Sequence, residues 1–264
     1  MSSHFLLLSD DFCEREGAAL VSGGSGGVGG EVCRMLAARG SRVALSYRSR
    51  PEAAEATVAA IEADGGTAAA FRADLADEAS ARALAAAARE RFGAIHTYVH
   101  AAGPPVHQLH LSRVEPALFR DHLEAEAGAF FNAVSPLLDD LRAAHGSIVA
   151  VTSAATDRFA VRDGLSAVPK AAVELLVRGL AVEEGRFGVR ANCVGPGMLE
   201  DGMAATLIER GDLDDAALDV ARANIPLRSF GTARDIAEAV CFLASDRARY
   251  ITAQVINVDG GYAA

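Results

Sequence analysis

A glycine-rich segment near the start of the chain has the residue types that bind phosphate. Residues 22–29 read SGGSGGVG, directly after an apolar run and at the start of a helical pattern. Glycines let the backbone approach a pyrophosphate, and the first turn of a helix offers unpaired N–H groups and the positive end of its dipole. We therefore predict that this turn binds a dinucleotide. The residues predicted to contact it are Ser22, Gly23, Ser25, Gly27, Val28 and Gly29.

A second group, of basic and hydroxyl side chains, follows the next β-rich run. Tyr47 is followed by Arg48, Ser49 and Arg50, and no carboxylate occurs before Glu52. An acidic side chain here would hydrogen-bond the ribose hydroxyls of NAD, whereas a guanidinium binds phosphate through a planar fork. The segment predicts NADP(H) rather than NAD(H), with Arg48 and Ser49 at the 2′-phosphate. The alternative is that the arginines belong to a solvated loop.

Two other sets of residues are not predicted to bind metal or to form disulfides. His107 and His110 have a metal-ligand spacing, but no carboxylate cluster accompanies them, so we expect a loop beside the substrate and no metal site. The cysteines lack a Cys-x-x-Cys pair and are expected to be free thiols in a reducing compartment. They are Cys13, Cys33, Cys193 and Cys241.

The elements that must position these residues alternate along the chain. Short β-rich runs alternate with longer Ala-, Glu- and Arg-rich helical patterns, which favours a parallel sheet with helices on both faces. The predicted strands span 18–22, 42–47, 67–72, 95–101, 147–152, 189–194 and 254–258. The predicted helices span 29–39, 51–63, 77–92, two patterns between 113 and 144, 169–187, one or two between 201 and 224, and 233–245. We expect a single doubly wound α/β domain with a seven-stranded parallel sheet over residues 17–264, after a short N-terminal extension at residues 1–16.

Charge and hydropathy limit the partners. The chain of 264 residues has 25 lysines and arginines against 35 aspartates and glutamates, a formal net charge of −10. This balance argues against a nucleic-acid partner bound through bulk positive charge. The N-terminus lacks the features of a signal peptide, and no apolar run reaches the roughly 18 residues of a membrane span. We expect a soluble cytoplasmic protein with a small-molecule substrate and no membrane partner.

Seven short motifs, in order from residue 22 to 261, resemble the short-chain dehydrogenase/reductase family. The glycine-rich turn fits its Thr-Gly-x-x-x-Gly-x-Gly pattern, with Ser22 in the Thr place. The other matches are Asp74-Leu75, His100-Ala101-Ala102-Gly103, Ser153, and residues 192–197 (NCVGPG), 231–236 (GTARDI) and 258–261 (VDGG).

This resemblance implies a Rossmann-type fold, an NAD(P)-dependent oxidoreductase and a homotetramer. It implies that Ser153 is catalytic and that Lys170 holds the nicotinamide ribose. The further cofactor contacts that it implies are Asp74, Leu75, Ala101, Ala102, Gly103, Pro196 and Gly197.

The chain departs from the family pattern at two places. The tyrosine of Tyr-x-x-x-Lys is replaced by Ser166, although Lys170 is present; a wider spacing would place an acid at Asp163. Because proline fits best in the first turn of a helix, we expect the helix to begin at Pro169, so that Ser166 and Lys170 need not share a regular helical face. On the preceding helical pattern Glu126 stands in the family's Asn place, as an acid in a dry cleft or as a solvent-facing side chain.

Both departures resemble the 2,4-dienoyl-CoA reductase branch, which lacks the tyrosine and keeps the lysine. The leading hypothesis is therefore NADPH-dependent reduction of the C=C bond of an enoyl- or dienoyl-thioester, carried by CoA or an acyl carrier. In this hypothesis Ser153 polarises the substrate oxygen, Ser166 donates a hydrogen bond and Glu126 is the acid. The alternatives are a carbonyl reductase with a relocated acid, and a cofactor-binding homologue without turnover. Arg158 and Arg162 are expected either to meet a carrier phosphate or acidic surface, or to form a plain surface loop.

Overall fold

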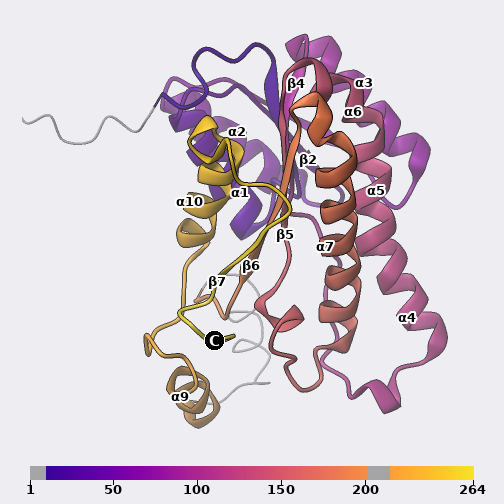
Figure 1. Ribbon diagram of the computed structural model, residues 1–264, viewed down its shortest axis with the longest axis vertical. Coiled ribbons are helices and arrows are strands. Elements are labelled where there is room, and N and C mark those ends of the chain that lie inside the picture. The colour runs from indigo at the N-terminus through magenta and orange to yellow at the C-terminus, as the bar shows by residue number, and fades with distance from the viewer. Residues whose placement is uncertain (1–9, 201–214) are drawn as a thin grey trace, which may run out of the picture.

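Seven parallel strands form one sheet in the order β3-β2-β1-β4-β5-β6-β7 (Figure 1). The computed structural model describes residues 10–200 and 215–264. The strands are β1 Ala18–Ser22, β2 Val43–Tyr47, β3 Ala68–Arg72, β4 Ile95–His100, β5 Ser147–Val151, β6 Arg190–Pro196 and β7 Val255–Val258. Strands β1 and β4 are buried at every residue, as expected for a parallel sheet covered on both faces. The prediction of a single doubly wound α/β unit with seven parallel strands is confirmed.

Helices pack on both faces of this sheet (Figure 1). One face is covered by α1 (Gly27–Ala38), α2 (Pro51–Ala63) and α10 (Ala233–Ala244). The other is covered by α3 (Glu78–Phe92), α5 (Ala129–Val134), α6 (Leu138–Ala143) and α7 (Gly164–Glu184). Two further helices lie elsewhere along the chain. Helix α4 (Pro116–Leu123) precedes the turn into α5, and α9 (Asp215–Ala223) follows β6.

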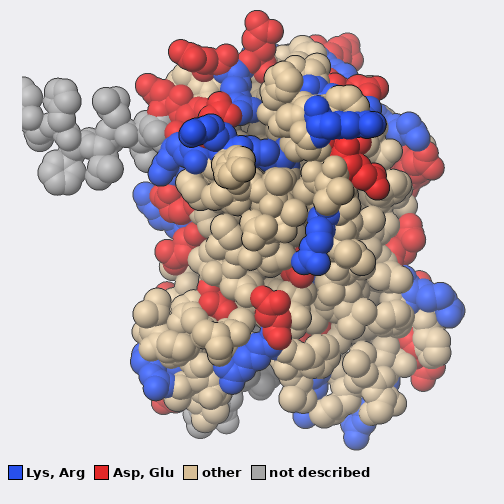
Figure 2. All heavy atoms as spheres, viewed as in Figure 1, with Lys and Arg blue, Asp and Glu red and all other residues tan. Residues whose placement is uncertain are grey.

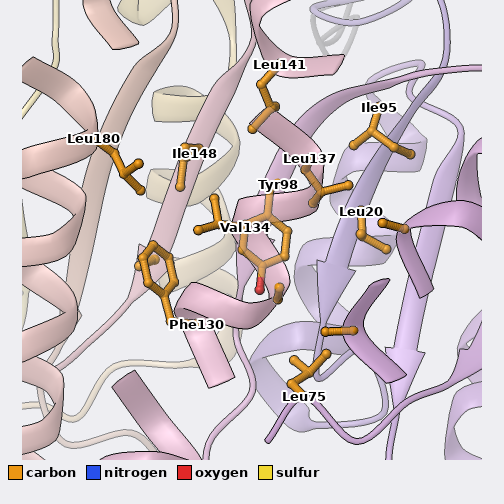
Figure 3. Packing of buried hydrophobic residues seen from close by; sticks show 14 of the residues in the cluster. Leu20, Leu75, Ile95, Tyr98, Phe130, Val134, Leu137, Leu141, Ile148 and Leu180 are labelled. Atoms are coloured by element: carbon orange, nitrogen blue, oxygen red, sulfur yellow. The ribbon is translucent and has the colours of Figure 1, made fainter. Parts of the chain in front are cut away.

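The core on the α3–α7 face packs helices against the middle of the sheet. Tyr98 of β4, Ile148 of β5 and Phe130 of α5 are buried there, and Figure 3 shows their side chains pointing toward one another. Burying a side chain of this size stabilises the fold by about 1.5–3 kcal/mol. This packing fixes the ends of the strands, and with them the loops that follow.

The strand order changes direction between β1 and β4. Strands β2 and β3 continue from one side of β1, and β4 to β7 extend from the other, so the loops after β1 and β4 diverge. The carboxyl ends of the strands at such a switch point form the usual ligand crevice of doubly wound sheets. Here the backbone N–H of Ala101 donates to the carbonyl of Ser22, 3.1 Å away, which joins the two loops at their bases.

Helix α7 begins earlier than predicted. It spans Gly164–Glu184 and includes Pro169 in its interior, so the expectation that the helix starts at Pro169 is wrong. Pro169 has no N–H for the carbonyl of Leu165 one turn back. His122 of α4 hydrogen-bonds the backbone of Leu165 instead, and thereby satisfies the group that proline leaves free. Ser166 and Lys170 therefore share one face of a helix.

The two helical patterns predicted between residues 113 and 144 form a broken run. Helix α4 passes into a π-helical turn, η2 (Glu124–Gly128), and then into α5, the short 3₁₀ turn η3 (Ser135–Leu137) and α6. A π turn inserts an extra residue into a helix and is frequent at functional sites. It carries Glu126, whose side chain is buried.

The first described residues pack against the fold. Phe12 is buried and its ring is stacked on that of His96 in β4, with the ring centroids 5.9 Å apart. The N–H of Phe12 donates to the carbonyl of Arg39 at the end of α1. Of the helices predicted between 201 and 224, α9 is described, and residues 201–214 lie outside the described residues.

Candidate active site

The glycine-rich turn links the end of β1 to the first turn of α1. Gly23 has φ +75°, and a Cβ on it would lie 2.6 Å from the carbonyl oxygen of Ala101. A Cβ on Gly29 would lie 2.3 Å from the carbonyl oxygen of Gly23, so only glycine allows this close approach. A Cβ on Gly27, in contrast, would meet nothing within 4 Å. The turn is thus tight at its base and open at the start of the helix, which is the shape that a pyrophosphate needs.

Basic side chains lie at the end of β2 beside this turn. Arg48, Ser49 and Arg50 are exposed, and Tyr47 is half-buried. The Nη2 atom of Arg50 lies 3.7 Å from the place of a Cβ on Gly26. Arg50 therefore reaches over the glycine-rich turn. A phosphate next to the turn would meet this guanidinium.

The loops after β3, β4 and β6 supply the remaining predicted cofactor contacts. Asp74 forms an Asx turn through its bond from the N–H of Ala76, 3.2 Å, and the carbonyl of Leu75 accepts a bond from Asn132 of α5. The N–H of Gly197 donates to the carbonyl of Val258, 3.0 Å, which holds the loop after β6 against β7. Ala101, Ala102, Gly103 and Pro196 are partly or fully exposed at the same edge of the sheet.

A buried polar cluster lies directly under the glycine-rich turn. The Nδ1 atom of His100 is 3.1 Å from Ser22 Oγ and 2.8 Å from the hydroxyl of Tyr98. Burial, and then the charge of Lys170, lowers the pKa of His100 to about 3, so the ring is neutral. This cluster was not predicted from the sequence, although β4 places residues 98 and 100 on one face of the strand.

Lys170 of α7 and Glu126 of η2 form an ion pair. The distance from Nζ to Oε1 is 2.7 Å, and the Glu126 side chain is 4% exposed. A Cβ on Gly103 would lie 3.0 Å from Glu126 Oε2 and 3.6 Å from Lys170 Nζ, so the loop after β4 covers the pair closely. The structure thus brings together three predicted site residues from three separate elements. The solvent-facing alternative for Glu126 is excluded.

Two serines lie on the elements beside this ion pair. Ser153 follows β5, and its Oγ accepts the N–H of Ala155, 3.1 Å, which leaves the hydroxyl proton free to donate. Ser166 is buried on α7, one turn before Lys170. Asp163 stands at the N-cap position of the same helix, and burial raises its pKa.

The remaining candidates lie around the site. Arg158 bonds to the carbonyl of Tyr262, and its guanidinium stacks over that ring. Arg162 Nε lies 3.3 Å from His110 Nε2, and both side chains are exposed in loops. In the described part of the chain no group of three histidine, cysteine or acidic side chains is arranged to hold a metal ion. None of the helices described there is both long and apolar enough to cross a bilayer.

These features define a class of protein: a dinucleotide-dependent oxidoreductase of the doubly wound type. The glycine turn, the arginine beside it, and a lysine with neighbouring hydroxyls occupy the carboxyl edge of a parallel sheet. Lysine and hydroxyl donors in such a place can bind a ribose and stabilise charge on a substrate oxygen.

Comparison with known proteins gives the family. A family profile described as "Enoyl-(Acyl carrier protein) reductase" matches residues 23–263. The chain is 33% identical over 245 residues to the 3-oxoacyl-[acyl-carrier-protein] reductase FabG of Staphylococcus epidermidis, covering 92% of this chain and 98% of the relative. It is also 33% identical over 244 residues to an L-rhamnose 1-dehydrogenase (NAD(P)(+)) of a Sphingomonas species, covering 92% and 94%. The chain belongs to the short-chain dehydrogenase/reductase family of NAD(P)-dependent oxidoreductases.

Solved structures agree with this assignment. An actinorhodin polyketide ketoreductase variant with NADPH superposes with a TM-score of 0.87 at 28% identity, covering 94% of this chain and 97% of the other. A blue fluorescent protein from a metagenomic library, in complex with NADPH, superposes with a TM-score of 0.86 at 31% identity, covering 96% and 100%.

Proposed function

We propose that this protein reduces a carbonyl group of a small-molecule substrate with NADPH, and that 3-oxoacyl thioesters are the first substrate class to test. The observation that carries the proposal is the placement of Ser166 and Lys170 on one face of α7, with Lys170 held by Glu126. The relatives act on carbonyl or hydroxyl groups by name. Among these comparisons, only the description of the family profile supports C=C reduction. The alternative, carbonyl reduction, agrees better with the names of the relatives.

The residues around the glycine-rich turn fit NADPH. The first turn of α1 would hold the pyrophosphate, because a Cβ on Gly27 would meet nothing within 4 Å and the first N–H groups of a helix lack partners within it. Arg50 and Arg48 would bind the 2′-phosphate, and Asp74 and Leu75 would border the adenine. NADPH, when bound, supplies a hydride. The NADPH named in two of the similar structures supports the same choice of cofactor.

The side chains of the catalytic edge then have separate tasks. Lys170 holds the nicotinamide ribose, and Glu126 positions the lysine by their 2.7 Å ion pair. Ser153 donates a hydrogen bond to the substrate oxygen, where negative charge grows as the carbonyl is reduced. Glu126 was predicted as the acid; the ion pair favours the positioning role.

We further propose that the protein is a homo-oligomer. Val168, Leu175 and Val182 recur every seven residues along α7 and are exposed at 38%, 66% and 75%. Figure 2, viewed as Figure 1, shows a surface around α7 that is mainly neither acidic nor basic. An apolar stripe with this period suits the same helix of a second copy.

One assay tests the proposed activity. NADPH absorbance is followed with 3-oxoacyl thioesters, simple ketones and enoyl thioesters, using the same carrier for each pair. We expect turnover of the 3-oxoacyl thioesters and little with the enoyl thioesters. Turnover of enoyl thioesters alone would restore the first hypothesis, and turnover of none of the three would favour a homologue without activity.

A further inference from the structure

Asp163 stands where a helix cap belongs but does not act as one. An aspartate at the N-cap position usually accepts a bond from a backbone N–H of the first turn. The Asp163 side chain makes no such bond; the N–H groups of Ser166 and Ala167 bond to its backbone carbonyl, at 2.9 and 2.8 Å. The carboxyl therefore does not cap the helix.

The surroundings of this carboxyl raise its pKa. Burial raises the pKa of Asp163, against hydrogen bonds from Gln108 and Ser166 and against the charge of Lys170, all of which lower it. The Nε2 atom of Gln108 donates to Oδ1 at 3.2 Å and brings the loop after β4 over the helix. The start of a helix also favours an ionised carboxylate, yet the pKa is raised, so burial is the larger effect.

Asp163 also stands on the same side of α7 as Ser166 and Lys170. Asp163, Ser166 and Lys170 follow one another at intervals of three and four residues, the spacing of neighbours on a helix surface. Ser166 stands between Asp163 and Lys170 in this series, and its hydroxyl hydrogen-bonds the Asp163 carboxyl. A serine hydroxyl is a poor acid by itself, but it can pass on its proton when a second group supplies it with a new one.

We propose that Asp163 is the proton source of carbonyl reduction, and that its proton reaches the substrate oxygen through the hydroxyl of Ser166. This inference rests on the proposed function. As hydride adds to the carbonyl carbon, the electron pair of the C=O π bond moves to oxygen. The oxygen takes the proton of Ser166 Oγ, and Ser166 takes the proton of Asp163. Water then returns a proton to the carboxylate.

The test measures kcat, KM and NADPH affinity across about pH 4–9 for the wild type and for Asp163→Asn. Reduction should slow as the pH rises through the pKa of Asp163, because the acid is lost. We expect Asp163→Asn to lower kcat by about 10²-fold or more, with NADPH affinity unchanged and this pH limb absent. Asp163→Glu, which keeps a carboxyl, should retain the limb. Glu183→Gln, an exposed change near the far end of α7, is the matched control and should leave kcat unaltered.

A double variant tests the order of transfer. If Asp163 and Ser166 act in series, Asp163→Asn/Ser166→Ala should be no slower than the slower single variant. Additive losses in the double variant would overturn the relay. So would an Asp163→Asn enzyme with the wild-type rate and pH profile.

Titration of the carboxyl by carbon NMR provides a readout that does not depend on turnover. We expect the Asp163 signal in the wild type to titrate above the reference pKa of about 3.9. Titration at or below that value overturns the inference, even where variants fold poorly. A wild type that reduces no carbonyl compound overturns the proposed function itself, whereas carbonyl turnover that is insensitive to Asp163→Asn overturns only the role of Asp163.

Discussion

At the scale of single residues, this chain replaces a tyrosine with separate side chains. The family pattern puts one tunable hydroxyl next to the lysine, whereas here Ser166, Glu126 and Asp163 surround Lys170 from two elements. Because we propose a separate task for each group, we expect substitutions to affect binding and catalysis differently.

Kinetic measurements can distinguish a positioning role of Glu126 from a role as the acid, because the two roles affect different parameters. Glu126→Gln keeps a hydrogen-bond acceptor but removes the charge that holds Lys170 at 2.7 Å. We expect weaker NADPH binding together with a lower kcat, because Lys170 loses its position. An acid would lose kcat and its pH dependence, with NADPH affinity unchanged. Fluorescence titration with NADPH, alongside steady-state rates, distinguishes the two.

We propose that cofactor choice depends on the arginines after β2. Arg48→Asp places a carboxylate where a phosphate is expected, so it should weaken NADPH binding by about tenfold or more relative to NADH. Arg50→Ala should have a similar but smaller effect, since its guanidinium reaches the turn at Gly26. Dissociation constants for both cofactors test this. A wild type that binds NADPH and NADH equally would contradict the assignment of these residues.

At the scale of elements, α7 depends on α4 because of one proline. Pro169 leaves the carbonyl of Leu165 without its helical partner, and His122 provides the hydrogen bond. We expect His122→Ala to destabilise the fold by about 1–3 kcal/mol, since a buried carbonyl would lose its donor. In a Pro169→Ala background the same change should cost less, because the new N–H can bond to Leu165. Urea unfolding of the wild type, the two single variants and the double variant measures the coupling between His122 and Pro169. Additive effects on the free energy of unfolding would disprove it.

The elements show which features the sequence allows one to predict. The strands, the glycine turn and the motif order follow from patterns local in the chain, and the seven-stranded sheet was predicted correctly. The start of α7 was not, because the donor that permits Pro169 in a helix comes from His122, more than forty residues earlier. The burial of Glu126 depends on the π turn and on Lys170, which lies on another helix. Such contacts arise in three dimensions and leave no periodic signal.

At the scale of the whole molecule, stability should depend on buried histidines. Burial lowers the pKa of both His96 and His100 to about 3, helped by nearby arginines at His96 and by Lys170 at His100. The unfolded chain binds these protons near pH 6.5, so stability is complete above that pH and is lost as the pH falls toward 3.

Between about pH 6.5 and 3, each of these histidines should lower the free energy of unfolding by about 1.4 kcal/mol for every unit by which the pH falls. Unfolding by urea at several pH values measures the slope. His100→Asn should reduce the slope by one such contribution, whereas the exposed His110→Gln should leave it unaltered. A stability that is flat between pH 6.5 and 5 would contradict this prediction.

Assembly should depend on the apolar stripe of α7. Leu175→Glu introduces a charge at its centre, so we expect a smaller species by light scattering after gel filtration. Val220→Glu on α9 changes an equally apolar exposed side chain outside the stripe and serves as the control. A monomeric wild type, or an oligomer that Leu175→Glu does not alter, would disprove the role of this helix.

The strand order has a consequence for how the chain folds during synthesis. Strand β1 pairs with β2 on one edge and with β4 on the other, so one edge of β1 stays unpaired until β4 has been made. An apolar strand with a free edge is the kind of surface on which nascent chains aggregate. Parallel pairings between distant segments also form slowly. We therefore expect the nascent chain to be prone to aggregation in the interval between the synthesis of β3 and that of β4.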